Sequence, residues 1–196
     1  MSVGYNMTNY YDINAKEYIE STINCDMSFH YQKFLKYMPK EGKILDIGFG
    51  SGRDMIYFKS LGYDVEGIDT STEFVKNMKD KGYKVELQSV CDMCCDKKYD
   101  GIWACASLLH VNRLLLESAL IKCINALAKD GVLYCSFKYG DKEVLKDSRY
   151  FNYINEEIIN DIALKNNLNI IEIYESMDVR KDRASEKWIN ILIKKI

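Results

Sequence analysis

The sequence predicts an α/β fold, a three-layer αβα arrangement in which helices cover both faces of a mostly parallel seven-stranded sheet with a C-terminal antiparallel hairpin. Three observations predict this fold. Strand-like apolar runs alternate with amphipathic helical segments along most of the chain, which is typical of βαβ units. The last two strand-like runs have no helix between them, and so short a connection suits an antiparallel pair. A glycine-rich loop directly follows the first strand, as at the ligand-binding edge of open α/β sheets.

Hydrophobic periodicity and capping residues predict the helices. Ser28 and Ser71 are suited to begin two of them, because a serine side chain can accept a hydrogen bond from the first helical turn. In the fifth helix, Leu116, Leu120 and Cys123 share one face, which predicts packing against the sheet. The predicted helices cover residues 9–22, 28–38, 52–60, 71–82, 112–131 and 155–167.

Short apolar runs bounded by turn residues predict the strands. Pro39 and Gly42 separate the first strand from the N-terminal helices, and the run KILDI reads as a fully buried strand. The predicted strands cover residues 43–47, 63–69, 83–89, 99–107, 132–138, 168–176 and 187–195. The first five are each separated by a helix or a long loop, so we expect them to be parallel.

Composition limits the class of protein. The chain has 196 residues, a length typical of one domain, and its formal charge of -2 gives no general attraction to nucleic acid. No apolar run is long enough to span a membrane, and the N-terminus lacks the features of a signal peptide. We therefore expect a cytoplasmic protein without membrane contact.

The cysteines do not indicate a metal site. Cys91, Cys94 and Cys95 lie close together in the sequence, but no second CxxC pair and no nearby histidine offers a fourth ligand. We predict a surface loop here and no bound metal. The odd total of seven cysteines also makes a disulfide framework unlikely in this context.

The loop GFGSG after the first strand indicates a nucleoside ligand. Its glycines allow the backbone to approach a ligand closely and to adopt positive φ. The spacing departs from the G-x-G-x-x-G fingerprint of dinucleotide sites, and the pyrophosphate of a dinucleotide would lie near the Asp46 carboxylate, which is unfavourable. Asp69 ends the second strand, where a carboxylate can accept hydrogen bonds from both ribose hydroxyls. A ligand with a ribose, a cationic end and no phosphate fits, as in S-adenosylmethionine (SAM).

Four stretches carry a family resemblance. ILDIGFGSGRD, VEGIDTS, YDGIWACASLLHV and LAKDGVLYCSFK closely resemble the successive motifs of class I SAM-dependent methyltransferases, in particular small bacterial enzymes of the tellurite-resistance or methyltransferase-domain type. The resemblance covers about residues 10–196. It implies the Rossmann-like class I methyltransferase fold, with residues 1–38 as an N-terminal helical lid and residues 39–196 as the SAM-binding part of one compact domain.

The resemblance also implies cofactor-binding residues. The glycine loop would hold the methionine side of SAM, Asp69 the ribose, and the residues after the fourth strand the sulfonium. Phe49 stands where the family often has a small residue, and Ser89, followed by Val90, stands where it commonly has an acidic residue against adenine. Arg53 is the best-placed cation for the SAM carboxylate. The full set is Asp46, Gly48, Phe49, Gly50, Gly52, Arg53, Asp69, Thr70, Ser71, Ser89, Val90, Cys105 and Ala106.

The acceptor side is predicted from polar residues near the same edge. His110 resembles a histidine found at that position in relatives and can polarise or deprotonate an acceptor. Tyr11, and after it Tyr10, would shape the methyl site from the N-terminal helix. Cations and tyrosines near the end of the chain hint at an anionic acceptor. The predicted substrate-binding residues are Lys138, Tyr139, Arg149, Tyr150 and Arg180.

Three functions are compatible with these motifs. The first is a SAM-dependent methyltransferase that acts on a small molecule by in-line displacement, because the chain is near minimal for the fold. The second is an RNA methyltransferase, for example on tRNA, that uses the basic residues of 178–195. The third is a SAM-binding module without catalysis. Nucleic acid is the less favoured partner because of the overall charge.

Overall fold

The structure is a computed structural model that describes residues 7–93 and 98–195. Its centre is a seven-stranded sheet in the order β3-β2-β1-β4-β5-β9-β8. The strands are β1 (Lys43–Ile47), β2 (Asp64–Asp69), β3 (Lys84–Leu87), β4 (Tyr99–Ala104), β5 (Leu127–Lys138), β8 (Asn169–Met177) and β9 (Lys187–Lys194). The first five are parallel, and β9 lies antiparallel between β5 and β8. The predicted parallel sheet with a C-terminal antiparallel hairpin is confirmed.

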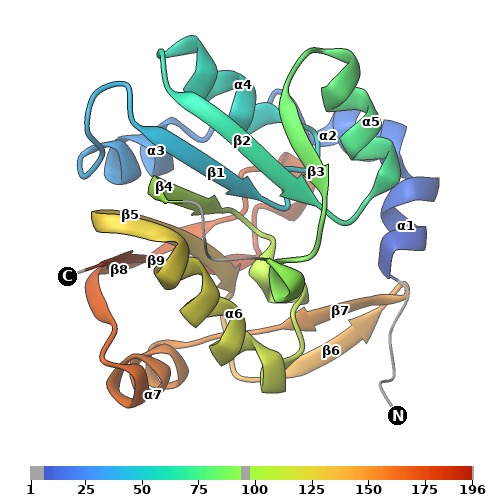
Figure 1. The fold of residues 1–196 in the computed structure, drawn as a ribbon. Helices are drawn as coiled ribbons and strands as arrows, with labels where there is room; N and C mark the ends of the chain where they lie inside the picture. Colours follow the sequence, from blue (N-terminus) through green and yellow to red (C-terminus); the bar gives the residue numbers. More distant parts are fainter. Residues whose placement is uncertain (1–6, 94–97, 196) are drawn as a thin grey trace.

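Helices cover both faces of this sheet (Figure 1). They are α1 (Met7–Ile13), α2 (Ala15–Thr22), α3 (Ser28–Leu35), α4 (Arg53–Ser60), α5 (Thr72–Asp80), α6 (Arg113–Ala126) and α7 (Glu156–Asn166), with 3-10 turns η1 (Val90–Asp92), η2 (Leu108–His110) and η3 (Lys181–Arg183). Side chains of α3, α4 and α5 form one core with one face of the sheet, and α6 and α7 form the other core with the opposite face. The three-layer prediction is therefore confirmed.

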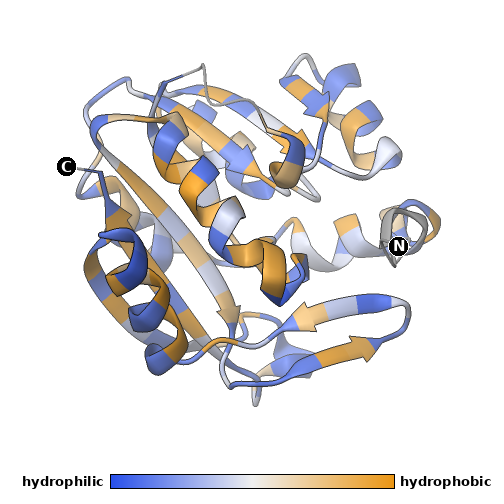
Figure 2. Cartoon of the chain, turned by 60° about the horizontal axis from the view of Figure 1, so that its bottom comes forward, coloured by the Kyte–Doolittle hydropathy of each residue, from blue (hydrophilic) through white to orange (hydrophobic). Residues whose placement is uncertain are grey.

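The strands of the central sheet are buried on both faces. Ile44 and Ile102 are fully buried, and Trp103 on β4 stacks on Tyr134 of β5 with ring centroids 4.0 Å apart. Figure 2 shows hydrophobic stretches along the strands of the central sheet, and hydrophobic and hydrophilic residues mixed along the helices. Nearly continuous hydrophobic runs of this kind are typical of parallel strands that helices cover on both faces.

Local chemistry shifts some predicted helix ends. The predicted first helix is divided into α1 and α2 at Asn14, whose side-chain amide donates to the Tyr10 carbonyl at 2.7 Å and so competes with the helix. The prediction that Ser28 caps α3 is wrong, because Met27 is the N-cap and the Ser28 hydroxyl and amide both donate to Asp26. Ser71 caps α5 as predicted, with its oxygen accepting from the Phe74 amide.

A second, two-stranded sheet was not predicted. Strands β6 (Glu143–Lys146) and β7 (Arg149–Asn152) pair as an antiparallel hairpin between β5 and α7. Asp147 and Ser148 join them with φ values of 50° and 60°, as in a type I′ hairpin turn. The hairpin lies beside α1 in Figure 1, and the Arg149 guanidinium lies 3.9 Å from the centroid of the Tyr10 ring.

The N-terminal helix is also fastened to α5. The Asp12 carboxylate accepts from the hydroxyls of Ser71 (2.6 Å) and Thr72 (3.0 Å) and from the amide of Glu73 (3.3 Å). Burial opposes ionisation of Asp12, but these hydrogen bonds outweigh it and lower the pKa of the carboxyl. Consequently α1 lies across the carboxyl ends of the strands and is held on both sides.

Candidate active site

The site begins at the glycine loop between β1 and α4. Gly48 and Gly52 have φ values of 68° and 78°, which an L side chain rarely adopts. A Cβ at Gly48 would lie 2.5 Å from the Cβ of Ser107, and one at Gly52 would lie 2.2 Å from the sulfur of Met78. Only glycine fits at these two positions, so the loop presents bare backbone at the sheet edge.

Two buried carboxylates flank this loop. Both oxygens of Asp69 accept backbone hydrogen bonds, one from Gly50 and one from Ser71, each at 2.9 Å. Burial raises the pKa of Asp69 to about 6, although these hydrogen bonds act in the opposite direction. Asp46 is 1% exposed, and its Oδ2 has no partner among the described residues. Burial, and then the Asp54 charge, hold the pKa of Asp46 well above its usual value.

A cavity of about 410 Å³ opens over these strand ends. We call it the cofactor cavity, and its volume is in the range of small-molecule sites. It is lined by residues that follow β1, β2, β3 and β4, together with one face of the N-terminal helices: Tyr11, Tyr18, Ile47, Gly48, Gly50, Ile68, Asp69, Thr70, Phe74, Gln88, Ser89, Val90, Cys91, Ala106, Ser107, Leu108, His110, Val111, Asn112 and Leu115.

A second cavity of about 100 Å³ adjoins the first, and both are lined by Tyr18, Gly48 and Ala106. Its wall includes the start of α4, the end of β5 and the loop between β8 and β9. We call it the second cavity. Its charged lining residues are Arg53, Asp54, Asp178 and Arg180.

The predicted cofactor residues divide among three places. Gly48, Gly50, Asp69, Thr70, Ser89, Val90 and Ala106 line the cofactor cavity. Phe49, Arg53 and Cys105 line the second cavity. Asp46, Gly52 and Ser71 line neither cavity. The Ser71 amide donates to the Asp69 carboxylate and so helps to orient it. The structure thus brings the whole predicted set to one edge of the sheet.

The predicted catalytic pair is in direct contact. The Tyr11 hydroxyl lies 2.7 Å from His110 Nε2, and His110 Nδ1 lies 2.6 Å from the Tyr150 carbonyl oxygen. A carbonyl only accepts, so Nδ1 carries the proton and Nε2 accepts from Tyr11. Burial lowers the pKa of His110 to about 4, and burial raises the pKa of Tyr11. Both groups are therefore neutral near pH 7.

The predicted substrate residues lie mostly outside the cavities. Arg180 lines the second cavity, whereas Lys138, Tyr139, Arg149 and Tyr150 line neither cavity. Tyr10, predicted for the methyl site, also lines neither. Lys138 pairs with Glu186 at 2.6 Å, and Tyr139 donates to Glu156. Arg149 is 7% exposed, stacks on Tyr10, and its Nε has no partner in the described part of the chain.

Sequence reasoning missed Tyr18 and Ser136. Tyr18 follows Tyr11 by two helical turns, a spacing that places both on one face of the N-terminal helices and could have identified it. Ser136 carried no such signal. It lies on β5 and its hydroxyl accepts from the Ala106 amide at 2.9 Å, which fixes the backbone where the two cavities meet.

Ala106 adopts a strained backbone conformation at this boundary. Its φ is 51°, and a left-handed L residue costs about 1–2 kcal/mol. We expect Ala106→Gly to raise the free energy of unfolding by up to about 1 kcal/mol, because the strain relieved exceeds the added chain entropy. The control is Ala104→Gly on β4, which should destabilise, and urea denaturation would measure both. Equal destabilisation by the two variants would contradict the strain.

Two further predictions concern a bound metal and a membrane span. Cys94 and Cys95 lie outside the described residues, and within 7–93 and 98–195 no cluster of histidine, cysteine or acidic side chains could hold a metal ion. Over the same residues, the structure contains no helix of the length and hydrophobicity that crossing a membrane requires.

Comparison with known proteins agrees with this geometry. Residues 45–135 match the methyltransferase domain family. An uncharacterized methyltransferase of Staphylococcus carnosus (strain TM300) is 25% identical over 187 residues, which cover 90% of this chain and 87% of the relative.

Two solved structures have the same fold. One is the Burkholderia thailandensis 1,6-didemethyltoxoflavin-N1-methyltransferase with bound 1,6-didemethyltoxoflavin and S-adenosylhomocysteine, with a TM-score of 0.79, 16% identity, and coverage of 96% of this chain and 87% of that one. The other is an S-adenosylmethionine-dependent methyltransferase from Clostridium acetobutylicum, with a TM-score of 0.68, 14% identity, and coverage of 96% and 97%. The matched region contains both Asp46 and Asp69, and the chain has the fold of these methyltransferase structures.

Proposed function

We propose that the protein transfers a methyl group from SAM to a small-molecule acceptor by in-line displacement. The observation that carries the proposal is the pair of buried carboxylates beside the glycine loop. The Oδ2 of Asp46 is buried and unpaired within the described residues, and Asp69 retains lone pairs beyond its two backbone bonds. An uncompensated carboxylate in a buried site is costly, and a ligand with a cationic end offsets this cost.

The residues that line the cofactor cavity offer the groups that SAM requires. Asp69 would accept from the ribose hydroxyls, and the bare backbone of Gly48 and Gly50 would allow the close approach of the methionine part. Ser89 and Val90 line the cofactor cavity, and we propose that they contact the adenine. When bound, SAM supplies a methyl group already activated on a sulfonium, so the chain's main contribution is alignment, which can lower a barrier by about 7–11 kcal/mol in favourable cases.

Tyr11 and His110 are placed to orient an acceptor rather than to deprotonate it beforehand. With the pKa of His110 at about 4, removing a proton from an acceptor of pKa about 9 would cost about 7 kcal/mol. The acceptor can instead donate a hydrogen bond to the Tyr11 oxygen while the Tyr11 hydroxyl proton points at His110 Nε2. This arrangement costs far less than full removal of the acceptor's proton. We infer that the acceptor proton leaves through Tyr11 and His110 only as methylation acidifies it.

The charge pattern favours a small acceptor over RNA. Several cations of the basic C-terminal segment already have acidic partners: Arg180 pairs with Asp178, Arg183 with Asp182, Lys187 with Glu175 and Lys194 with Asp130. Such pairing leaves less positive charge for phosphates. The Burkholderia thailandensis relative, which acts on 1,6-didemethyltoxoflavin, is an example of a small-molecule acceptor on this fold.

We further propose that residues 1–38 act as a lid on the methyltransferase part. The Asp12 bonds to α5 and the stacking of Arg149 on Tyr10 hold α1 across the cofactor cavity. These contacts hold only α1. Ala15, Met27, Tyr31 and Phe34 of the same segment belong to the core with α4 and α5, so we propose that the lid opens at α1 while α3 stays packed.

Methyl-labelled SAM tests the proposed function. Incubation of the protein with labelled SAM and a metabolite extract is expected to transfer label to small molecules. Incubation with tRNA at low salt is expected to transfer none. Label in tRNA but not in the metabolites would contradict the small-molecule assignment.

Replacement of His110 should separate catalysis from cofactor binding. We expect His110→Ala to lower turnover about 10²-fold, the lower end of acid–base effects, because Tyr11 loses its hydrogen-bond acceptor. Affinity for S-adenosylhomocysteine should change less than twofold in calorimetry. His110→Gln, which can still accept from Tyr11, should recover part of the turnover. Full activity of His110→Ala would make this histidine structural.

Cofactor affinity should depend on pH through Asp69. Because the ionised carboxylate accepts the ribose hydroxyls, protonation near pH 6 removes the better acceptor. One unit below that pKa about a tenth of the protein is competent, so the Kd for S-adenosylhomocysteine should rise about tenfold. The raised pKa also means that the ligand-free protein loses stability as pH rises from about 4 to 6, since the folded state binds the proton more tightly. Asp69→Asn should flatten the binding profile; an unchanged slope would exclude Asp69 as its origin.

A further inference from the structure

Three successive residues of α1 contact three different parts of the protein. The Tyr11 hydroxyl lies 2.7 Å from His110 Nε2. Tyr10, one residue earlier, has the Arg149 guanidinium 3.9 Å from its ring centroid, and Asp12, one residue later, accepts hydrogen bonds from the start of α5. Successive residues of a helix are turned by about 100°, so the two flanking residues hold opposite sides of α1. Tyr11, between them, faces the cofactor cavity.

The position of α1 depends on such contacts. The helix has only seven residues, Met7–Ile13, and a helix of this length is not stable by itself. Asn14 interrupts it directly afterwards. Ala15 is the first fully buried residue of the nearby core among the described residues, and Tyr11 packs against that core only partly buried. Polar contacts therefore contribute strongly to where Tyr11 lies.

Asp12 supplies the polar contacts on the α5 side. Its Oδ1 accepts from the Ser71 hydroxyl at 2.6 Å and from the Glu73 amide at 3.3 Å. Its Oδ2 accepts from the Thr72 hydroxyl at 3.0 Å. The carboxylate lies at the N-terminus of α5, where the helix dipole stabilises a negative charge, and hydrogen bonds to an ionised acceptor are the stronger ones. Asp12 is therefore a strong anchor for α1.

The segment that Asp12 contacts also forms part of the cofactor site. The Ser71 amide donates to the Asp69 carboxylate at 2.9 Å, while the Ser71 hydroxyl donates to Asp12. Asp69 and Thr70 line the cofactor cavity. One short segment, residues 69–73, thus contacts both the cofactor cavity and α1.

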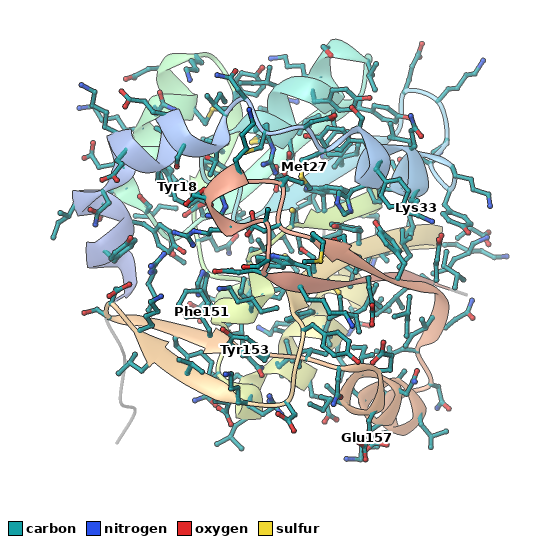
Figure 3. The ribbon with its side chains drawn as sticks, turned by 180° about the vertical axis from the view of Figure 1, so that it is seen from behind. Tyr18, Met27, Lys33, Phe151, Tyr153 and Glu157 are labelled. Atoms are coloured by element: carbon teal, nitrogen blue, oxygen red, sulfur yellow. The ribbon has the colours of Figure 1, made fainter. Side chains whose placement is uncertain are left out.

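The β6–β7 hairpin holds the other member of the catalytic pair. The Tyr150 carbonyl oxygen lies 2.6 Å from His110 Nδ1, and the ring centroid of Phe151 lies 5.0 Å from that of His110. Figure 3 shows this hairpin from behind, with Phe151 labelled, next to the N-terminal helices. His110 is therefore held independently of α1, and Tyr11 is the member of the pair whose position depends on that helix.

We propose that Asp12 is a positioning residue for methyl transfer, which holds Tyr11 on His110 and keeps this pair in register with the ribose carboxylate Asp69. The inference rests on the proposed function and deepens it. Asp12 lines neither cavity, so it acts through Tyr11 and not by contact with a ligand.

The imidazole signals of the ligand-free protein test this role directly, because the chain has only two histidines. In a proton–nitrogen correlation spectrum, Asp12→Ala should move the His110 Nε2 signal toward its value in Tyr11→Phe, since the hydrogen bond from Tyr11 is lost. Asp12→Asn keeps one acceptor oxygen, so its signal should lie between that of Asp12→Ala and that of the unaltered protein.

Two controls accompany this spectrum. His30 is 6% exposed, and its Nδ1 lies 2.9 Å from the Tyr174 hydroxyl, remote from α1 in the contacts that hold it. An unmoved His30 signal shows that the fold is intact. Glu17→Gln removes an exposed charge from α2 in the same N-terminal segment and should move neither histidine signal.

Transfer of label from methyl-labelled SAM to a metabolite extract gives a second readout. At saturating SAM, Asp12→Ala should lower the rate at least about tenfold, the shift expected when hydrogen bonds to a charged group are lost. In a Tyr11→Phe background the same change should lower the rate less than about twofold, because Tyr11 is no longer there to be positioned. A merely structural role would give the same fold loss in both backgrounds.

The outcomes distinguish this inference from the proposed function. An unmoved His110 signal in Asp12→Ala would overturn the inference, and so would equal fold losses in the two backgrounds. Absence of label transfer by the unaltered protein would instead overturn the proposed function, while the spectrum still tests Asp12. If Asp12→Ala disturbs the His30 signal, Asp12→Asn decides: movement of its His110 signal supports the role of Asp12, and an unmoved signal overturns it.

Discussion

Asp69→Ala is expected to weaken SAM and S-adenosylhomocysteine by about 1–3 kcal/mol, a 5- to 150-fold rise in Kd, because ribose hydroxyls lose their charged acceptor. The variant also leaves the amides of Gly50 and Ser71 without their acceptor, so the loop itself is less well held. Calorimetric titration with S-adenosylhomocysteine measures the loss directly.

A matched control for this variant lies on the same strand. Asp64 begins β2 at the opposite end from the cavity, and its side chain is 49% exposed in an ion pair with Lys84. Asp64→Ala should leave the Kd unchanged, since exposed pairs contribute little. Unchanged affinity of Asp69→Ala would mean that the ribose lies elsewhere.

Asp54→Ala is expected to lower the free energy of unfolding by about 3–5 kcal/mol, the range for breaking a buried ion pair by removing one partner. Asp54 is 6% exposed and accepts from Arg53 at two positions, from the Tyr31 hydroxyl at 2.5 Å and from the Trp103 indole at 2.8 Å. Its loss leaves a buried guanidinium and two further donors without an acceptor.

Urea denaturation measures this effect against two controls. Asp54→Asn keeps an oxygen acceptor and should cost less than Asp54→Ala. Asp80→Ala, at an exposed position at the end of α5, should change stability by less than about 0.5 kcal/mol. A change below about 1 kcal/mol for Asp54→Ala would show that Arg53 finds water or another partner on its own.

The sequence alone predicts the position of a site residue where the local pattern of strands and loops determines it. Asp46 and Asp69 could be placed because both lie in short buried strands, and carboxyl ends of parallel strands meet at one edge of the sheet. The family resemblance indicates Tyr11 and His110 as separate site residues and does not predict that they touch. Their hydrogen bond spans 99 residues of sequence, and no local pattern specifies such a pairing.

Features set by long-range packing could not be predicted. The turn of the β6–β7 hairpin uses Asp147 and Ser148 at positive φ, without the Asn-Gly or Asp-Gly signal that marks such turns in sequence. Likewise, Arg180 could be recognised as basic and near the C-terminus, but its position in the second cavity depends on how the loop folds back onto the N-terminal helices.

The most direct measurement is calorimetric titration of the purified protein with S-adenosylhomocysteine and, separately, with NAD. The two carboxylates beside the glycine loop predict that S-adenosylhomocysteine binds at one site per chain and that NAD, whose pyrophosphate would face Asp46, does not. Binding of NAD without binding of S-adenosylhomocysteine would contradict the account.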